Sequence, residues 1–344
     1  MCNANFIFHS TLLRYTCITH YTLHITQIPS TNNIAMEFLY QRDIYGQTLV
    51  ELGGLNKDIV VLDADLSSST RTGLFAREFP ERFFNLGVAE QNMMGVASGL
   101  AACGKIVFVS TFAIFATGRA WDQVRNSICY SNLDIKIVAS HAGITVGPDG
   151  ASHQALEDIA LMRVIPNMNI IVPCDGPQAR DAVLACVNTK GPFYIRLGRP
   201  KVPTIDNKGE FILGKAEVLT SGDDIAIIAC GIMVSEALAA VKNLLQKGIK
   251  ARLINVHTIR PLDSQTILKA ARETRGIIVC EEHTVIGGLA SSIQEVVAEN
   301  SPVKVICLGI KNKFGQSGEP AQLLKEYNLT SLDIEKAASL LLRK

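Results

Sequence analysis

The chain has 344 residues, which exceeds the usual size of a single hydrophobic core, so two domains are expected. Lys and Arg number 33 against 32 Asp and Glu, and the formal net charge of +1 gives no overall bias toward nucleic acid or an anionic membrane. A hydrophobic content of 48% is ample for a core, yet no apolar run reaches the roughly 18 residues of a membrane-spanning helix.

Residues 1–35 differ in composition from the rest of the chain. They contain no Asp, Glu or Lys and a single Arg, Arg14. An organelle presequence would also be poor in acids, but it should be Arg-rich and amphipathic, and this segment is neither. We therefore expect a disordered or mis-assigned extension, with Met36 as the true start.

From Tyr40 onward, helical and strand-like segments alternate, which predicts a parallel sheet with helices on both faces. The predicted strands are short runs rich in Val and Ile, as expected for a sheet covered on both faces. We place a helix at 89–103 and strands at 58–63, 105–110, 135–140, 169–173 and 193–197. The first domain is therefore predicted to span 36–200.

Prolines and glycines without apolar periodicity follow, and they predict a linker at 201–212. A second alternation predicts a domain at 213–344. Its strands are expected at 224–229, 250–256, 276–280 and 303–307, with helices at 235–246, 264–273, 289–299 and 332–342. The predicted fold class is α/β, with two doubly wound domains.

The nine cysteines are scattered along the chain, and none belongs to a CxxC pair that would indicate a zinc or redox site. Most lie among Ala, Val and Ile, where a free thiol packs as a small hydrophobic side chain. This usage fits a reducing compartment, so we expect a cytoplasmic protein with no metal site of its own.

Polar residues follow four of the predicted strands of the first domain, at the point where each strand ends. Ligands of open α/β sheets bind beyond the carboxyl ends of the strands, so these groups are expected to lie at one edge. The groups are Asp63 to Arg71, Ser110 to Phe115, His141 to Gln154, and Arg196 to Arg199. Taken singly, each has an ordinary explanation: a helix cap, core aromatics, loop histidines and surface arginines. Their convergence on one edge favours a binding site.

Glu90 is a carboxylate among apolar neighbours where a helix is predicted to begin, in the stretch Phe84 to Gly95. A carboxyl group held out of water can lend or share a proton near neutral pH. Alternatively, Glu90 is an ordinary first-turn acid favoured by the helix dipole.

Four motifs resemble those of transketolase: Asp63-Ala-Asp65-Leu66, Gly87-Val-Ala-Glu90-Gln91, Ser110-Thr-Phe112-Ala-Ile-Phe115, and Val146-Gly-Pro-Asp149-Gly-Ala-Ser-His153-Gln154. The resemblance covers about Tyr40 to Lys344 and corresponds to the C-terminal half of that enzyme, a pyrimidine-binding domain followed by the transketolase C-terminal domain. The GDG and metal motif of the diphosphate-binding domain is not found in this sequence. The resemblance therefore implies the C-terminal subunit of a split, two-chain transketolase.

The resemblance also implies roles for individual residues. Glu90 would hydrogen-bond the aminopyrimidine of thiamine diphosphate, and His153 would face the substrate hydroxyls beside the reacting carbon; these two are the catalytic candidates. The cofactor-binding candidates are Asp65, Leu66, Val88, Glu90, Phe112 and Phe115. The substrate-binding candidates are Arg42, Ser69, His141, Asp149, His153 and Arg199. Gly118 departs from the family pattern, since full-length transketolases place a Tyr there.

The implied activity is transfer of a two-carbon ketol unit between sugar phosphates, as in the pentose phosphate pathway. The implied partner is an N-terminal transketolase subunit that holds Mg²⁺ or Ca²⁺, in a two-plus-two heterotetramer. No metal ligand, nucleic acid or membrane is expected for this chain. In the second domain the best polar candidates are His257, Glu281, Glu282 and His283, and we expect a structural or interfacial role for His283.

Three alternatives remain. A β subunit of a 2-oxoacid dehydrogenase decarboxylating component has the same architecture but normally lacks the Gly-Pro-Asp-Gly-Ala-Ser-His-Gln loop. A deoxyxylulose phosphate synthase carries a similar turn but is ordinarily one fused chain. A non-catalytic paralogue is disfavoured by retention of Glu90, Asp149 and His153.

Overall fold

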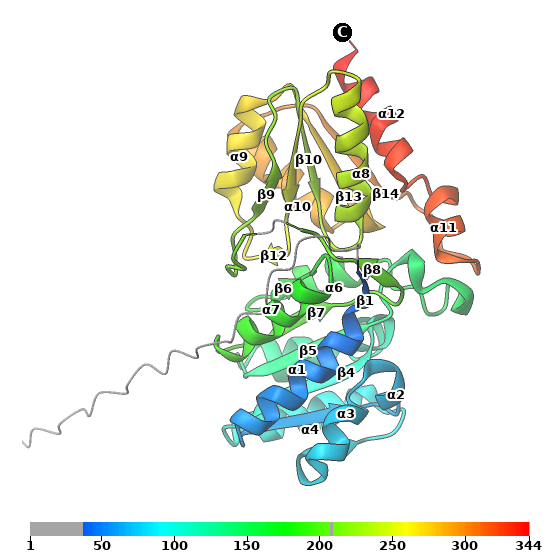
Figure 1. The fold of residues 1–344 in the computed structure, drawn as a ribbon. Coiled ribbons are helices and arrows are strands. Elements are labelled where there is room, and N and C mark those ends of the chain that lie inside the picture. Colours follow the sequence, from blue (N-terminus) through cyan, green and yellow to red (C-terminus); the bar gives the residue numbers. More distant parts are fainter. Residues whose placement is uncertain (1–36, 207–208, 344) are drawn as a thin grey trace, which may run out of the picture. The chain divides into compact units, whose positions relative to one another are not determined.

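The computed structural model describes residues 37–206 and 209–343 (Figure 1). The predicted extension at 1–35 and the proposed start at Met36 lie outside the described residues. Residues 37–343 belong to one compact unit that contains two large sheets and one two-stranded sheet. None of the helices in the described ranges is long and apolar enough to cross a bilayer.

The first sheet has seven strands in the order β12-β6-β7-β5-β4-β2-β3, and every neighbouring pair except β12 with β6 is parallel. Its central strands are buried along most of their length, which explains their continuous Val and Ile runs. The strands are β2 (Ile59–Asp63), β3 (Phe83–Asn85), β4 (Ile106–Phe112), β5 (Ile135–Ser140), β6 (Asn169–Ile171), β7 (Phe193–Arg196) and β12 (Thr258–Arg260).

Helices cover both faces of this sheet, as predicted. On one face, α1 packs against α3 and α7; on the other, α4 packs with the irregular helices η2 and η3. Their bounds are α1 (Gln41–Leu55), α2 (Ser67–Thr70), α3 (Gly73–Glu78), α4 (Glu90–Ala102), η2 (Phe115–Arg119), η3 (Val124–Cys129), η4 (Ile144–Asp149), α6 (Asp158–Arg163) and α7 (Gly176–Val187); η1 (Pro80–Arg82) and α5 (Trp121–Gln123) are single turns.

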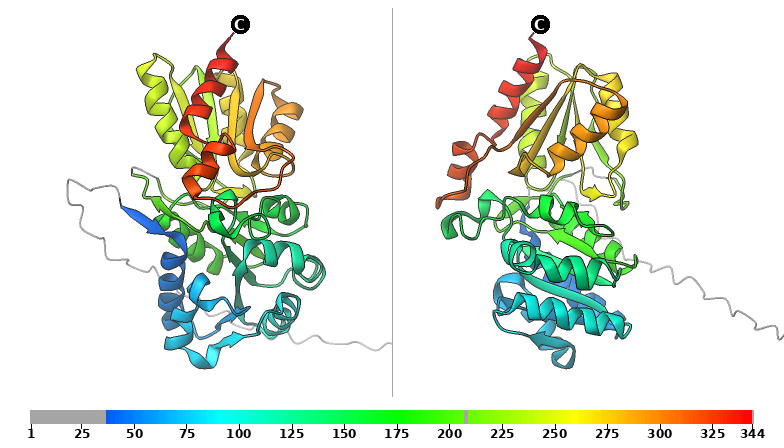
Figure 2. Two further views of the ribbon diagram at one scale, coloured as in Figure 1. Left: turned by 90° about the vertical axis from the view of Figure 1, so that its right-hand side faces the viewer. Right: turned by 180° about the vertical axis from the view of Figure 1, so that it is seen from behind.

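The second sheet has five strands in the order β14-β13-β10-β11-β9, with only β9 antiparallel (Figures 1 and 2). Helices α8 and α12 pack together on one face, and α9 and α10 on the other. The strands are β9 (Glu217–Thr220), β10 (Ile225–Ala229), β11 (Ala251–Asn255), β13 (Ile277–Thr284) and β14 (Val305–Ile310). The helices are α8 (Met233–Gln246), α9 (Ser264–Glu273), α10 (Leu289–Asn300), α11 (Pro320–Glu326) and α12 (Ser331–Leu342).

Two strand pairings were not predicted. The start of the predicted linker forms β8 (Lys201–Pro203), which pairs antiparallel with β1 (Phe38–Tyr40). Strand β12 comes from the predicted second domain but joins the first sheet, antiparallel to β6. Each of these strands has only three residues, which is too short for a hydrophobic period to be recognised.

Candidate active site

The predicted site residues lie where strands of the first sheet end. Asp65 and Leu66 follow β2, Phe112 ends β4, His141 follows β5, and Arg199 follows β7. Because these strands are parallel, their carboxyl ends meet at one edge. Arg42 reaches this edge from the first turn of α1. The sequence analysis correctly predicted that the polar groups share this edge.

Glu90 is the first residue of α4, and its side chain is only 1% exposed. Arg119, at the end of η2, donates from Nη1 to both carboxylate oxygens at 2.8 Å. The same guanidinium lies over the ring of Phe115, 4.6 Å from its centre. Arg119 itself is 48% exposed, so the buried carboxylate is paired with a cation at the surface. The helix dipole and this cation together account for a carboxylate in an apolar setting.

Two phenylalanines and two histidines form one aromatic cluster. The rings of Phe112 and Phe115 are stacked with centroids 6.0 Å apart, and His141 stacks on Phe112 at 3.9 Å. His153 meets Phe115 edge-on at 5.4 Å. Phe112 and Phe115 come from β4 and η2, and the histidines from the loop after β5, so parallel strand order brings them together. Gly118 is exposed, and a Cβ built on it would contact nothing within 4 Å.

Basic side chains gather beside this cluster. Arg42 Nη1 lies 3.5 Å from His141 Nε2 and donates to the Ser69 carbonyl at 3.3 Å. Arg42 Nε is buried and has no hydrogen-bond partner among the described residues. Arg42 and Arg199 both line a cavity of about 300 Å³. A buried guanidinium donor without a partner, beside a cavity with a second Arg, suits an anionic ligand.

Burial lowers the pKa of His141 to about 3, and the positive charges of Arg42 and Arg199 act in the same direction. His141 is therefore neutral at physiological pH. Its Nδ1 lies 2.9 Å from Ser140 Oγ, and its Nε2 faces Arg42. A neutral imidazole can accept a hydrogen bond from the guanidinium, which leaves the local positive charge on the arginines.

The other predicted residues occupy loops beside the cluster. Asp149 ends η4, and its Oδ1 is 3.6 Å from Arg199 Nη1. Asp65 accepts at 3.0 Å from Asn85 Nδ2, and the Leu66 N–H donates to Asp63. Val88 is 73% exposed on the turn before α4. Asn85 Oδ1 also accepts from the Gly87 N–H, which joins the loop of Asp65 to the turn of Val88.

Arg196 is not a ligand-facing residue, although the sequence grouped it with Arg199. It is 5% exposed and donates from Nε to Asp158 Oδ2 at 2.7 Å. Burial acts to raise the pKa of Asp158, but the charges of Arg196 and His283 outweigh it and hold that pKa below its usual value. His283 Nε2 lies 3.9 Å from Asp158 Oδ1, so His283 of β13 meets α6 of the first domain.

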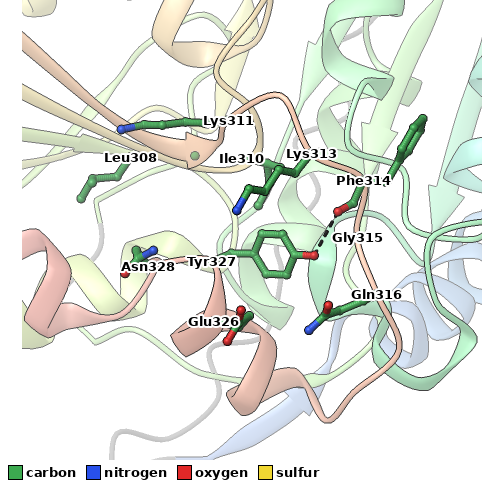
Figure 3. Close-up of a pocket in the computed structure, with 11 residues that line it drawn as sticks. Leu308, Ile310, Lys311, Lys313, Phe314, Gly315, Gln316, Glu326, Tyr327 and Asn328 are labelled. Atoms are coloured by element: carbon green, nitrogen blue, oxygen red, sulfur yellow. Dashed lines mark hydrogen bonds between the residues drawn. The ribbon is translucent and has the colours of Figure 1, made fainter.

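A larger cavity of about 610 Å³ lies within the second domain, between the end of β14 and the turn after α11 (Figure 3). Tyr327 crosses it and donates from its hydroxyl to the Phe314 carbonyl at 3.0 Å. None of the predicted site residues lines this cavity. We therefore assign the candidate active site to the edge of the first sheet.

Sequence reasoning missed Arg119. It named Glu282 as a polar candidate and included Thr145 in the loop after β5, but it did not predict the contact between these two residues. Arg119 is 29 positions from Glu90, and Glu282 is 137 positions from Thr145, whose backbone N–H it accepts. No local spacing signals either contact, since both are made by tertiary packing.

Comparison with known proteins identifies the family. Residues 39–204 match the model "Transketolase, pyrimidine binding domain", and residues 214–334 match "Transketolase, C-terminal domain". The chain belongs to the transketolase family. The expectation from the four motifs is thereby confirmed, as is the fold of two parallel-sheet α/β domains.

Several relatives within this family are named as a section, a subunit or a split-gene form of transketolase. A "Putative transketolase C-terminal section" of Methanocaldococcus jannaschii is 48% identical over 85% of this chain and 93% of the relative. The "6-deoxy-6-sulfo-D-fructose transketolase subunit SqwH" of Clostridium sp. (strain MSTE9) is 41% identical over 89% and 95%. A solved structure described as "Split gene transketolase, inactive beta4 tetramer" is 49% identical, with a TM-score of 0.81 over 88% of this chain and 98% of that one.

Thiamine diphosphate use is a property of this transketolase family, and the residues at the edge fit its pyrimidine ring. The buried carboxyl group of Glu90 can share a proton with a ring nitrogen, and the stacked faces of Phe112 and Phe115 suit a flat heterocycle. Within the described ranges, no group of His, Cys, Asp and Glu could hold a metal ion.

Proposed function

We propose that this chain is the C-terminal subunit of a two-chain transketolase that transfers a two-carbon ketol unit between sugar phosphates. The observation that carries the proposal is the juxtaposition of a 1% exposed Glu90 with the Phe112 and Phe115 rings and the Arg42 and Arg199 cavity. It occurs in a chain that is 48% identical to a transketolase C-terminal section.

Thiamine diphosphate, when bound, supplies the carbon nucleophile that ketol transfer requires. Glu90 would hold a proton at the pyrimidine ring, and Phe112 and Phe115 would orient that ring. Asp65, Leu66 and Val88 would support the cofactor from the neighbouring loops. A carboxyl group with a side chain only 1% exposed is suited to sharing a proton with a single bound group.

On the substrate side, Arg42, Ser69, His141 and Arg199 would bind the anionic end of the sugar, and Asp149 and His153 would contact its hydroxyls. Two hydrogen-bonding groups on one loop can distinguish hydroxyl configurations, because a mismatched hydroxyl leaves a buried group unpaired. The SqwH relative is named for a sulfonated sugar, so a sulfonate is a second anion that the arginines could take. The ratio of activities on xylulose 5-phosphate and 6-deoxy-6-sulfo-D-fructose decides between the two anions.

The partner is proposed to be an N-terminal transketolase subunit that contains the diphosphate-binding domain and holds Mg²⁺ or Ca²⁺. Exposed surface beside Glu90 supports a partner: Val88 and Phe84 are exposed apolar residues, and Gly95 and Gly99 of α4 face open space. We propose a two-plus-two heterotetramer in the cytoplasm, acting in pentose phosphate metabolism.

The decisive test is to purify the chain alone and together with the partner candidate, and to assay xylulose 5-phosphate with ribose 5-phosphate. We expect turnover only with both chains present. Turnover by this chain alone would contradict dependence on a partner. Pyruvate decarboxylation without ketol transfer would instead favour the 2-oxoacid dehydrogenase β subunit, and no activity with any partner would favour a non-catalytic paralogue.

A further inference from the structure

The loop that carries Asp149 is in contact with the C-terminal domain. Glu282, on β13, has a side chain only 3% exposed, and its Oε1 accepts the backbone N–H of Thr145 in η4. The contact is close-packed, because a Cβ built on Gly143 would overlap the Glu282 carboxyl group. The start of the substrate-side loop is therefore held against a side chain of the other domain.

A short path leads from this contact to the substrate cavity. The residue after Thr145 is Val146, and its carbonyl accepts a hydrogen bond from Arg199 Nη1. The same guanidinium lies 3.6 Å from Asp149 at the other end of η4. Thr145, Arg42 and Arg199 all line one cavity. Fixing the backbone at Thr145 thus fixes an anchor of the Arg199 guanidinium.

We propose that Glu282 is a positioning residue for the sugar-phosphate site, which acts by holding Thr145 so that η4 presents Arg199 to the phosphate. The inference rests on the proposed function and adds to it a role for the C-terminal domain. Glu282 touches neither substrate nor cofactor, so its effect is transmitted through the backbone of the loop.

The charges that face Glu282 come from both domains. Arg196 on β7 donates from Nη2 to the Glu282 carbonyl at 2.9 Å, and Asp158 on α6 pairs with Arg196. Glu281 and His283 flank it on β13. Burial raises the pKa of Glu282 to about 7, against the attraction of Arg196. Glu282 is therefore ionised at pH 8 and mostly neutral at pH 6, and an ionised carboxylate is the stronger acceptor for the Thr145 N–H.

The test uses the assembled two-chain enzyme and two donors that differ only in the phosphate, fructose 6-phosphate and fructose. Glu282→Leu removes the acceptor, and we expect kcat/KM for fructose 6-phosphate to fall about tenfold through KM, since an unpaired buried N–H is costly. For fructose, kcat/KM should stay within about twofold, because the phosphate anchor plays no part. Glu282→Gln keeps an acceptor oxygen and should lose only about threefold.

Glu281→Gln is the matched control. Glu281 is an equally buried acid on the same strand, but its carboxylate accepts from Leu289 and Ala290 at 2.7 and 2.9 Å within its own domain. This substitution should change kcat/KM for fructose 6-phosphate and for fructose by the same factor, or change neither. The pH profile gives a second readout: KM for fructose 6-phosphate should rise from pH 8 to pH 6 more in the wild type than in Glu282→Gln. Titration of the substrate affects both enzymes alike.

The inference would be overturned if Glu282→Leu lowered kcat/KM equally for fructose 6-phosphate and fructose. It would also be overturned if Glu281→Gln lowered kcat/KM for fructose 6-phosphate alone. Either result would leave the proposed function standing. A wild-type and a Glu282→Gln enzyme with identical pH profiles would also count against it. If the wild-type pair transfers no ketol unit from any sugar phosphate, the proposed function fails and takes this inference with it.

Discussion

The charged and titratable residues of the candidate site lie in three different surroundings. Glu90 is buried at the start of α4 and paired with Arg119, whose guanidinium lies over the ring of Phe115. His141 is neutral because burial and two arginines act together. Arg42 and Arg199 line the wall of one cavity. These three situations lead to separate predictions.

Glu90→Gln keeps the shape of the side chain and one acceptor for Arg119 but cannot share a proton. We expect the assembled enzyme to lose at least about 100-fold in kcat, the scale of a positioned acid or base. Folding should be nearly unchanged, as measured by the thermal unfolding midpoint of the chain. Activity within a few-fold of wild type would show that Glu90 has no role in activating the cofactor.

Arg199→Leu removes the charged fork at the substrate cavity. We expect KM for the sugar phosphate to rise about 10- to 100-fold with a smaller change in kcat. Arg180→Leu is the control, because Arg180 pairs with Glu51 at 2.6 Å on α1 and α7, away from the cavity. An unchanged KM in Arg199→Leu would remove this residue from the substrate site.

The depressed pKa of His141 predicts how stability depends on pH. The unfolded chain binds a proton at His141 below about pH 6.5, whereas the folded protein excludes it until about pH 3. Stability therefore decreases as pH falls through this window. Between pH 7 and pH 5, urea unfolding should show wild type losing about 2 kcal/mol more than His141→Gln. Parallel losses in the two proteins would mean that His141 is protonated in the folded state.

At the level of elements, the site residues lie at the ends of the strands of the first sheet, and η4 contacts the Arg199 guanidinium. The strands are fixed by burial, since β2 and β5 are buried at every residue. The loop is fixed by glycines and by contacts with the other domain. Gly143 has φ 85° and Gly147 has φ 81°, which L side chains rarely adopt. Gln154 holds the same loop by donating to the Ile144 carbonyl at 3.0 Å and the Gln316 carbonyl at 2.9 Å.

Gly143→Ala tests the packing of this element. The added methyl would strain a left-handed backbone and press on Glu282, so we expect a loss of about 2 kcal/mol or more in unfolding free energy, together with a raised KM for sugar phosphates. Gly54→Ala is the control, because a Cβ there meets nothing within 4 Å on α1. Equal stability of the two variants would show that the loop is not tightly packed.

On the scale of the whole molecule, the two sheets are joined by more than a linker. Strand β12 follows β11 of the second sheet in the sequence but pairs with β6 of the first sheet. A buried polar network also spans both domains and consists of Asp158, Arg196, Glu282 and His283. Breaking such a network by removing one partner is more costly than losing a surface ion pair. The two domains should therefore unfold together, which differential scanning calorimetry would show as one transition.

The exposed surface around Glu90 predicts that thiamine diphosphate binds tightly only to the assembled two-chain enzyme. Calorimetric titration of this chain alone should show weak or no binding with Mg²⁺ present, and the mixture with the N-terminal subunit should bind measurably tighter, because a site shared between chains is complete only in the complex. Equal affinity for the chain alone and for the complex would contradict a shared site.

The sequence by itself determined the fold class and the sheet edge at which the candidate residues gather. Buried parallel strands have a recognisable Val and Ile pattern, and the polar residues that follow them share one edge by geometry. Only the tertiary structure decided the partners of those residues. Arg119 on Glu90, Glu282 on Thr145 and β12 on β6 join segments far apart in the chain or too short to show a period, and packing rather than local pattern brings them together.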